Sequence, residues 1–134
     1  MFECDAKLSA DGVPFLLHDA TLDRTTDGHG PAAARPWAEL AALDAGAWHG
    51  PAHRGERLPT LAQAARWGLS AGVRLNLEIK PPAGQGDAAG RAGSSALGAE
   101  LSATTAAGPA CTAGPDCGHA DVHAVRGPSA GGRD

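Results

Sequence analysis

Three acidic residues carry the clearest chemical signal in this chain of 134 residues. Glu3 and Asp5 are separated by one residue in a stretch where apolar and polar residues alternate, so on a strand both carboxylates share a face. Glu78 stands on the polar side of a second alternating stretch. Hard divalent cations prefer oxygen ligands. The acids therefore predict a metal site if the two stretches meet at one end of a sheet, whereas acids at unrelated strand ends simply face water.

A histidine and a lysine add candidates for proton transfer and anion binding. His18 ends an apolar run and precedes Asp19, a carboxylate that can orient its imidazole, so it is a candidate proton-transfer group. Lys80 lies on the same face as Glu78 and is suited to an anionic substrate such as a phosphate. The structural alternatives are a strand-end histidine without a chemical role and an ordinary salt bridge of Lys80.

Two short strands are predicted to position Glu3, Asp5 and His18. Residues 2–8 alternate between apolar and polar, and residues 13–18 form an apolar run typical of a buried strand. A turn signal at 10–12 separates them. The pair is either a hairpin or two segments of a parallel barrel with a minimal connection, and the local pattern does not choose between them.

A helix and a third strand follow a long loop. Residues 20–59 are mostly loop, with a short helical pattern at 37–43. Thr60 begins a capping box, and helical spacing continues until Gly72, a typical C-terminal stop. Residues 75–79 alternate again before two prolines end the strand. Strand, helix and strand in succession predict an α/β fold.

The composition changes after Pro82. Leu, Ile, Val and Phe number 20, and 16 of them precede that residue, so residues 1–82 are one small domain or a piece of a larger one. Residues 83–134 are a Gly, Ala and Pro tail that we expect to be mostly disordered, with a short helix near 95–103.

The tail also holds cysteines and histidines, at Cys111, Cys117, His119 and His123. They suggest a zinc site, although the five-residue gap between the cysteines is outside the usual spacing and no core surrounds them. The odd cysteine count, without a secretory signal, favours reduced thiols and a soluble cytoplasmic protein.

Composition also limits the class of partner. No window is apolar enough to span a membrane. The chain has 11 Lys and Arg against 15 Asp and Glu and no basic cluster, which argues against nucleic acid. A small-molecule substrate is the remaining expectation, and the sequence does not predict the oligomeric state.

Taken in order, these motifs resemble the glycerophosphodiester phosphodiesterase family. The segments that carry the resemblance are Glu3-Cys-Asp5, Leu17-His18-Asp19, Leu22-Asp-Arg24-Thr25-Thr26, Asp44-Ala-Gly46-Ala-Trp48, Leu58-Pro59-Thr60-Leu61 and Asn76-Leu-Glu78-Ile-Lys80. The match is collinear over residues 2–82, which makes it more specific than any single motif.

The resemblance implies a (β/α)8 barrel of the phosphatidylinositol-phosphodiesterase-like type and hydrolysis of glycerophosphodiesters to sn-glycerol 3-phosphate and an alcohol. It also implies a divalent cation, Mg²⁺ or Ca²⁺. Glu3, Asp5 and Glu78 match the metal ligands, His18 matches one of two catalytic histidines, and Lys80 matches a lysine near the substrate. Residues 20–58 resemble the insertion that covers the site.

One part of the family pattern has no counterpart in the matched residues. The family has an earlier strand that ends in His-Arg-Gly and supplies a second histidine and a phosphate-binding arginine, and we expect a partial barrel without it or the later strands. His53-Arg54-Gly55 spells the same triplet, but we interpret it as coincidence because it lies in the loop before Pro59-Thr60-Leu61 and no strand leads directly into it. The alternative function is an inactive fragment that binds a divalent cation or an anionic ligand.

Overall fold

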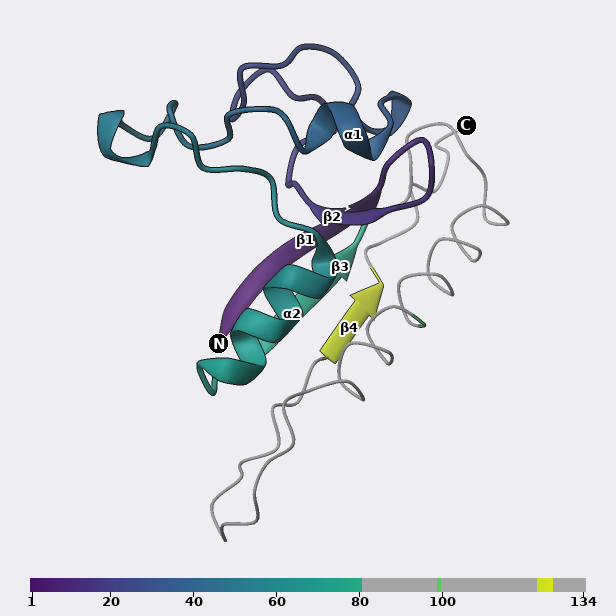
Figure 1. Ribbon diagram of the computed structural model, residues 1–134. Helices are drawn as coiled ribbons and strands as arrows, with labels where there is room; N and C mark the ends of the chain where they lie inside the picture. The colour runs from purple at the N-terminus through teal and green to yellow at the C-terminus, as the bar shows by residue number, and fades with distance from the viewer. Residues whose placement is uncertain (81–98, 100–122, 127–134) are drawn as a thin grey trace, which may run out of the picture.

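The computed structural model describes residues 1–80, 99 and 123–126 of the chain (Figure 1). The elements in chain order are β1 (Phe2–Leu8), β2 (Pro14–Leu16), η1 (Ala32–Ala34), α1 (Trp37–Leu40), η2 (Pro51–His53), α2 (Leu61–Ser70), β3 (Leu75–Ile79) and β4 (His123–Arg126). The strands form one sheet in the order β2-β1-β3-β4. The predicted α/β class is confirmed for this described part of the chain.

Strand β1 lies inside the sheet and has a different kind of neighbour on each side. It pairs in parallel with β3, which sets Asp5 opposite Glu78, and antiparallel with β2, which sets Lys7 opposite Phe15. The turn between β1 and β2 is closed by the amide of Ser9, which donates to the carbonyl of Val13 at 3.0 Å. Of the two arrangements left open by the sequence, the hairpin is therefore the one observed, with β2 shorter than the predicted 13–18.

Helix α2 covers one face of the sheet, as Figure 1 shows. Thr60 and Gln63 form the predicted capping box, and Gly72 follows the helix with a φ of 63°, a backbone conformation that glycine adopts without strain. Leu61 of α2 packs with Ala6 and Leu77 into a small core. This core leaves the other face of β1 and β3, which carries the polar residues, free of the helix.

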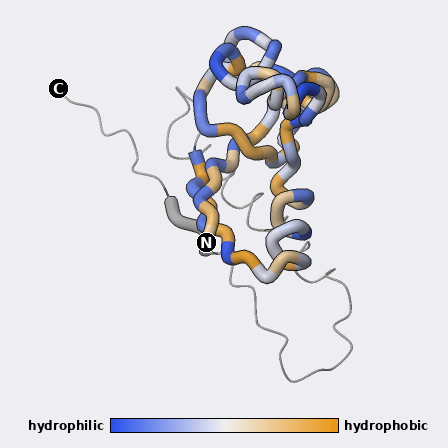
Figure 2. The backbone as a smooth tube through the Cα atoms, turned by 90° about the vertical axis from the view of Figure 1, so that its left-hand side faces the viewer, coloured by the Kyte–Doolittle hydropathy of each residue, from blue (hydrophilic) through white to orange (hydrophobic). Residues whose placement is uncertain are grey.

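The segment 20–58 builds a second core, which lies next to β2. Its apolar residues pack with β2 into a buried cluster of Phe15, Leu17, Leu22, Ala32, Leu40 and Leu58. In Figure 2 this segment is the upper part of the tube, where hydrophobic and hydrophilic stretches are interspersed. The predicted long loop is thus a folded cap that contains α1 and two 3-10 turns, and its core is fixed to the sheet through β2.

One strand lies where no regular structure was predicted. Residues His123–Arg126 form β4, which pairs in parallel with β3. No strand was predicted within the tail 83–134, because pairing along the open edge of β3 uses backbone groups and needs no apolar periodicity. The predicted helix near 95–103 and the cysteines of the proposed zinc site lie outside the described residues, apart from residue 99. Among the described residues no helix is both long and apolar enough to cross a bilayer.

Candidate active site

The three predicted acids meet on the polar face of the sheet. Because β1 and β3 run in parallel register, Asp5 lies opposite Glu78, and Glu3 lies two residues earlier on β1, opposite Asn76. One carboxylate oxygen from each of Glu3, Asp5 and Glu78 lies within 4.8 Å of the other two. Three carboxylate oxygens at this separation form a donor set of the type that Mg²⁺ and Ca²⁺ take.

Asp5 is the buried member of this cluster. Its exposed fraction is 7%, and the ammonium nitrogen of Lys80 lies 2.8 Å from its Oδ1. Apart from this ion pair, Oδ1 is buried without a hydrogen-bond partner among the described residues. A buried carboxylate needs a positive partner, and Lys80 is the cation that contacts Asp5 in the described part of the chain.

Lys80 reaches Asp5 because the ladder continues one residue beyond β3. Its backbone amide donates to the carbonyl of Ala6 at 3.0 Å, which holds the residue beside β1. Contact with the Asp5 carboxylate raises the pKa of Lys80. The salt bridge that was the structural alternative for Lys80 is therefore present, and its partner is Asp5.

Lys7 is a further cation near the acids that sequence reasoning left without a role. It is half-buried and lies on β1 two residues after Asp5, on the same face by strand alternation. Burial, followed by the charge of Lys80, lowers the pKa of Lys7. Alternation was the signal that placed Lys7 with the acids, but it gave no indication of a function.

His18 is held next to Asp5 by the backbone that precedes it. The amide of Leu17 donates to the carbonyl of Asp5 at 3.0 Å, and His18 follows directly. Its Nδ1 lies 2.8 Å from Oδ1 of Asp19, and 66% of its side chain is exposed. The imidazole is therefore fixed by one ring nitrogen and remains open to a ligand at the other.

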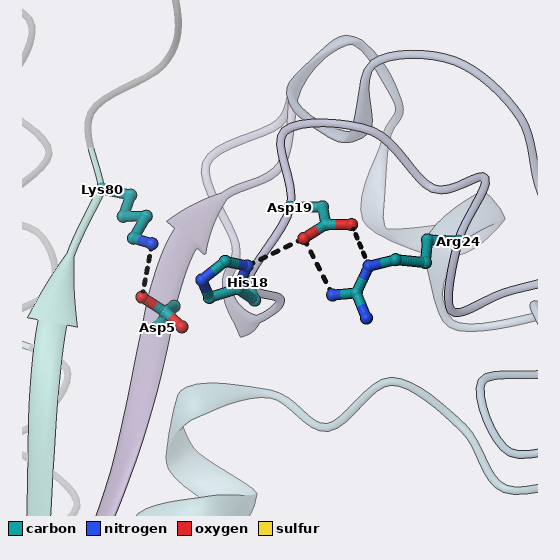
Figure 3. Close-up of polar contacts among 5 residues, drawn as sticks. All are labelled: Asp5, His18, Asp19, Arg24 and Lys80. Atoms are coloured by element: carbon teal, nitrogen blue, oxygen red, sulfur yellow. Dashed lines mark hydrogen bonds and ion pairs between the residues drawn. The ribbon is translucent and has the colours of Figure 1, made fainter. Parts of the chain in front are cut away.

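Arg24 holds Asp19 from the opposite side, as Figure 3 shows. Its Nε donates to Oδ2 of Asp19 at 2.6 Å and its Nη2 to Oδ1 at 2.9 Å. The Arg24 guanidinium, with His18 as a smaller contribution, holds the pKa of the Asp19 carboxyl well below its usual range. Sequence reasoning identified Asp19 as the partner of His18 but missed Arg24, because a pairing across five residues of loop leaves no periodic signal.

A pocket of about 410 Å³ is lined by both Asp5 and His18. Asp5, His18, Arg24, Trp48 and Arg57 line it, together with apolar residues of β2 and the cap. The indole Nε1 of Trp48 donates to the carbonyl of Ala45 at 2.9 Å, which orients this half-exposed ring. The pocket combines an acid, an imidazole and two guanidinium groups, which is the chemistry needed to bind an anion and transfer a proton beside it.

The triplet His53-Arg54-Gly55 is not part of the pocket wall. His53 ends the 3-10 turn η2 and its ring lies 4.9 Å from that of His49. No strand leads directly into it in the described segment 1–80, as the sequence predicted, since α1 is the preceding helix and η2 contains His53, and the triplet is not among the residues that line the pocket. Among the described histidines, His18 is the one on the pocket wall.

Comparison with known proteins identifies one family over most of the chain. The model of the glycerophosphoryl diester phosphodiesterase family matches residues 1–103. A putative glycerophosphodiester phosphodiesterase of Bacillus subtilis is 42% identical over 82 residues, which cover 60% of this chain and 34% of that protein. A glycerophosphodiester phosphodiesterase of Caldanaerobacter subterraneus is 38% identical over 78 residues, 58% of this chain and 32% of that protein. The chain spans about a third of the length of these relatives.

Solved structures of phosphodiesterases share the fold. A glycerophosphodiester phosphodiesterase from Agrobacterium tumefaciens superposes with a TM-score of 0.55 and 36% identity, covering 57% of this chain and 33% of that one. A phosphodiesterase from Oleispira antarctica, solved in complex with the product sn-glycerol 3-phosphate, superposes with a TM-score of 0.65 and 36% identity, covering 81% of this chain and 41% of that one. The described α/β structure therefore corresponds to a part of these larger enzymes.

Proposed function

Because the chain belongs to the glycerophosphoryl diester phosphodiesterase family, we propose that it takes part in metal-dependent hydrolysis of glycerophosphodiesters to sn-glycerol 3-phosphate and an alcohol. The observation that carries the proposal is the convergence of Glu3, Asp5 and Glu78 on one sheet face, with His18 on the wall of the adjoining pocket. The Oleispira antarctica relative was solved with sn-glycerol 3-phosphate, which is the product that the proposed reaction releases.

Glu3, Asp5 and Glu78 are the proposed ligands of Mg²⁺ or Ca²⁺. Their fit to such an ion is supported by the all-oxygen donor set and by the burial of the Asp5 carboxylate, whose Oδ1 has the ammonium of Lys80 as its partner among the described residues. A divalent cation bound there supplies Lewis-acid stabilisation of the charge on the phosphoryl oxygens. Lys80, through its ammonium group beside Asp5, adds positive charge for the phosphate on the β3 side of the site.

His18 is the proposed proton-transfer group. Its Nδ1 faces Asp19, so Nε2 is the atom at which the imidazole accepts or returns a proton. In the hydrolysis a water-derived oxygen forms a bond to phosphorus, the bond from phosphorus to the alcohol oxygen breaks, and the alcohol gains a proton. A second group completes the proton balance on the other side of phosphorus. The described residues place no second histidine on the pocket wall.

The test is release of glycerol 3-phosphate from glycerophosphocholine by the purified chain, with Mg²⁺ or Ca²⁺ and with a chelator. We expect metal-dependent release that His18→Ala and Glu78→Gln abolish. Glu39→Gln is the matched control, since Glu39 is an exposed carboxylate on α1 that contacts Arg35. Release that persists in the chelator, or equally in His18→Ala, contradicts the proposal.

The second candidate function is binding without turnover, and it is favoured by the fact that His18 is the one histidine that the described residues place on the pocket wall. Calorimetric titration of the chain with Mg²⁺ or Ca²⁺ separates the two candidates. Cation binding that requires Glu78, without product release, supports the binding function. Absence of both binding and release contradicts both functions.

A further inference from the structure

We propose that Arg24 is a positioning residue that acts through Asp19 to hold the imidazole of His18 in one orientation and one tautomer. The inference rests on the proposed role of His18, because it assigns the group that prepares Nε2 for proton transfer. It goes beyond that role by naming a residue that need not touch the reacting atoms.

The geometry of Asp19 carries the proposal. Oδ1 contacts both Nδ1 of His18, at 2.8 Å, and Nη2 of Arg24, at 2.9 Å, while Oδ2 accepts from Nε of Arg24 at 2.6 Å. Two parallel contacts from a planar guanidinium fix the plane of a carboxylate as well as its position. With Asp19 fixed and fully charged, Nδ1 of His18 carries the hydrogen, and the lone pair is at Nε2.

His18 needs this support because little else restrains it. Two thirds of its side chain is exposed, and Asp19 is the hydrogen-bond partner of its ring in the described structure. An exposed imidazole without a fixed acceptor populates both tautomers and several rotamers. Figure 3 shows the spatial order of these side chains: Arg24 and His18 lie on opposite sides of Asp19, and Asp5 lies beyond the imidazole of His18.

A guanidinium is required for this arrangement. A lysine ammonium at position 24 would keep the charge but has no planar pair of donors, so it cannot fix the plane of the carboxylate. The competing explanation is that the pair only closes the loop between residues 19 and 24. The two explanations differ in what they predict for the ring nitrogens of His18.

The test is the tautomer ratio of His18, read from the ¹⁵N shifts of its ring in the full chain at alkaline pH, where imidazoles are neutral. The His18→Ala variant identifies the signals. In the unmodified chain we expect the tautomer with hydrogen on Nδ1 to dominate. Arg24→Gln is expected to lower the ratio of the two tautomers about two- to fivefold, the range that exposed ion pairs contribute, and Arg24→Lys is expected to lower it less.

Arg35→Gln is the matched control, because Arg35 pairs with the exposed Glu39 on α1, and it is expected to leave the ratio unchanged. An unchanged ratio in Arg24→Gln overturns the proposal. If that variant does not fold, an unchanged ratio in the folded Arg24→Lys overturns it instead. The readout requires no turnover, so failure of the proposed phosphodiesterase activity with a shifted tautomer ratio contradicts the function and leaves the role of Arg24 supported.

Discussion

At the scale of single residues, the ion pair between Lys80 and Asp5 is expected to affect stability, and it involves one of the proposed metal ligands. The carboxylate of Asp5 is 7% exposed, and Lys80 supplies the positive charge 2.8 Å from its Oδ1. The buried Asp5 carboxylate therefore depends on Lys80 for charge compensation. Loss of that neighbour leaves a desolvated charge without compensation.

The first prediction is that Lys80→Met lowers the free energy of unfolding by about 1–3 kcal/mol, because Asp5 is then buried without a cation. Urea denaturation measures the change. Arg35→Met is the control, and its exposed pair with Glu39 is worth about 0.5 kcal/mol or less. Equal losses in the two variants would contradict a special role for the buried pair.

The second prediction concerns acid and Asp19. Because Arg24 lowers the pKa of Asp19 in the folded state, the charged carboxylate contributes stability above its unfolded pKa of about 3.9, and this contribution is lost as the pH falls toward the lowered folded value. The stability difference between the unmodified chain and Asp19→Asn is therefore expected to be full above about pH 5 and to shrink below about pH 4. Urea midpoints measured across this range provide the test, with Glu39→Gln as baseline. A difference that stays constant down to the lowest pH at which the chain folds would oppose this assignment.

At the scale of elements, α2 holds the two strands that carry the acids. The helix begins at a capping box in which the Thr60 hydroxyl accepts from the Gln63 amide, and the Gln63 side chain accepts from the Thr60 amide. Its first residue, Leu61, is buried against Ala6 of β1 and Leu77 of β3. The start of α2 thus fixes the helix over the pair of strands whose other face is the candidate site.

The third prediction is that Thr60→Ala lowers the free energy of unfolding by about 1 kcal/mol, because the Gln63 amide in the first turn of α2 loses the hydroxyl that accepts its hydrogen bond. Ser70→Ala is the control in the last turn of the same helix, where the hydroxyl donates to the carbonyl of Trp67 on the surface. Its cost is expected to stay within about 0.5 kcal/mol. Urea denaturation of both variants decides the matter, and a cost at Thr60 no greater than that at Ser70 would count against the capping box.

At the scale of the whole molecule, local patterns predicted the elements and left their partners open. Alternation in residues 2–8 predicted β1, alternation in residues 75–79 predicted β3, and the capping box predicted α2, because each signal lies within one element. The sequence did not show whether Glu78 lies near Asp5, because that depends on how the strands pair. The parallel register of β1 and β3 places the two residues opposite each other. The hairpin stayed undecided because an apolar run does not encode the direction of its neighbour.

The features that the sequence did not predict depend on contacts between distant residues. Leu22, Leu40 and Leu58 are single apolar residues in a loop-like segment, and they show no period even though they share one core. Arg24 was visible only as part of a family motif, and its bond to Asp19 appears only when the loop is folded. Strand β4 forms on a backbone edge, where side-chain patterns carry little information.

The last prediction joins these scales, because a cation held by Glu3, Asp5 and Glu78 links β1 to β3 only in the folded chain. Binding to the folded state alone raises stability by mass action, by about 2.7 kcal/mol at a free cation concentration 100 times the dissociation constant. Thermal unfolding with increasing Mg²⁺ or Ca²⁺ is therefore expected to shift to higher temperature, and Glu78→Gln is expected to reduce the shift. Glu39→Gln, which removes one exposed carboxylate on α1, is expected to retain it. A shift of the same size in all three proteins would indicate general screening of the net charge of -4, and no shift in the unmodified chain would exclude the three acids as a cation site.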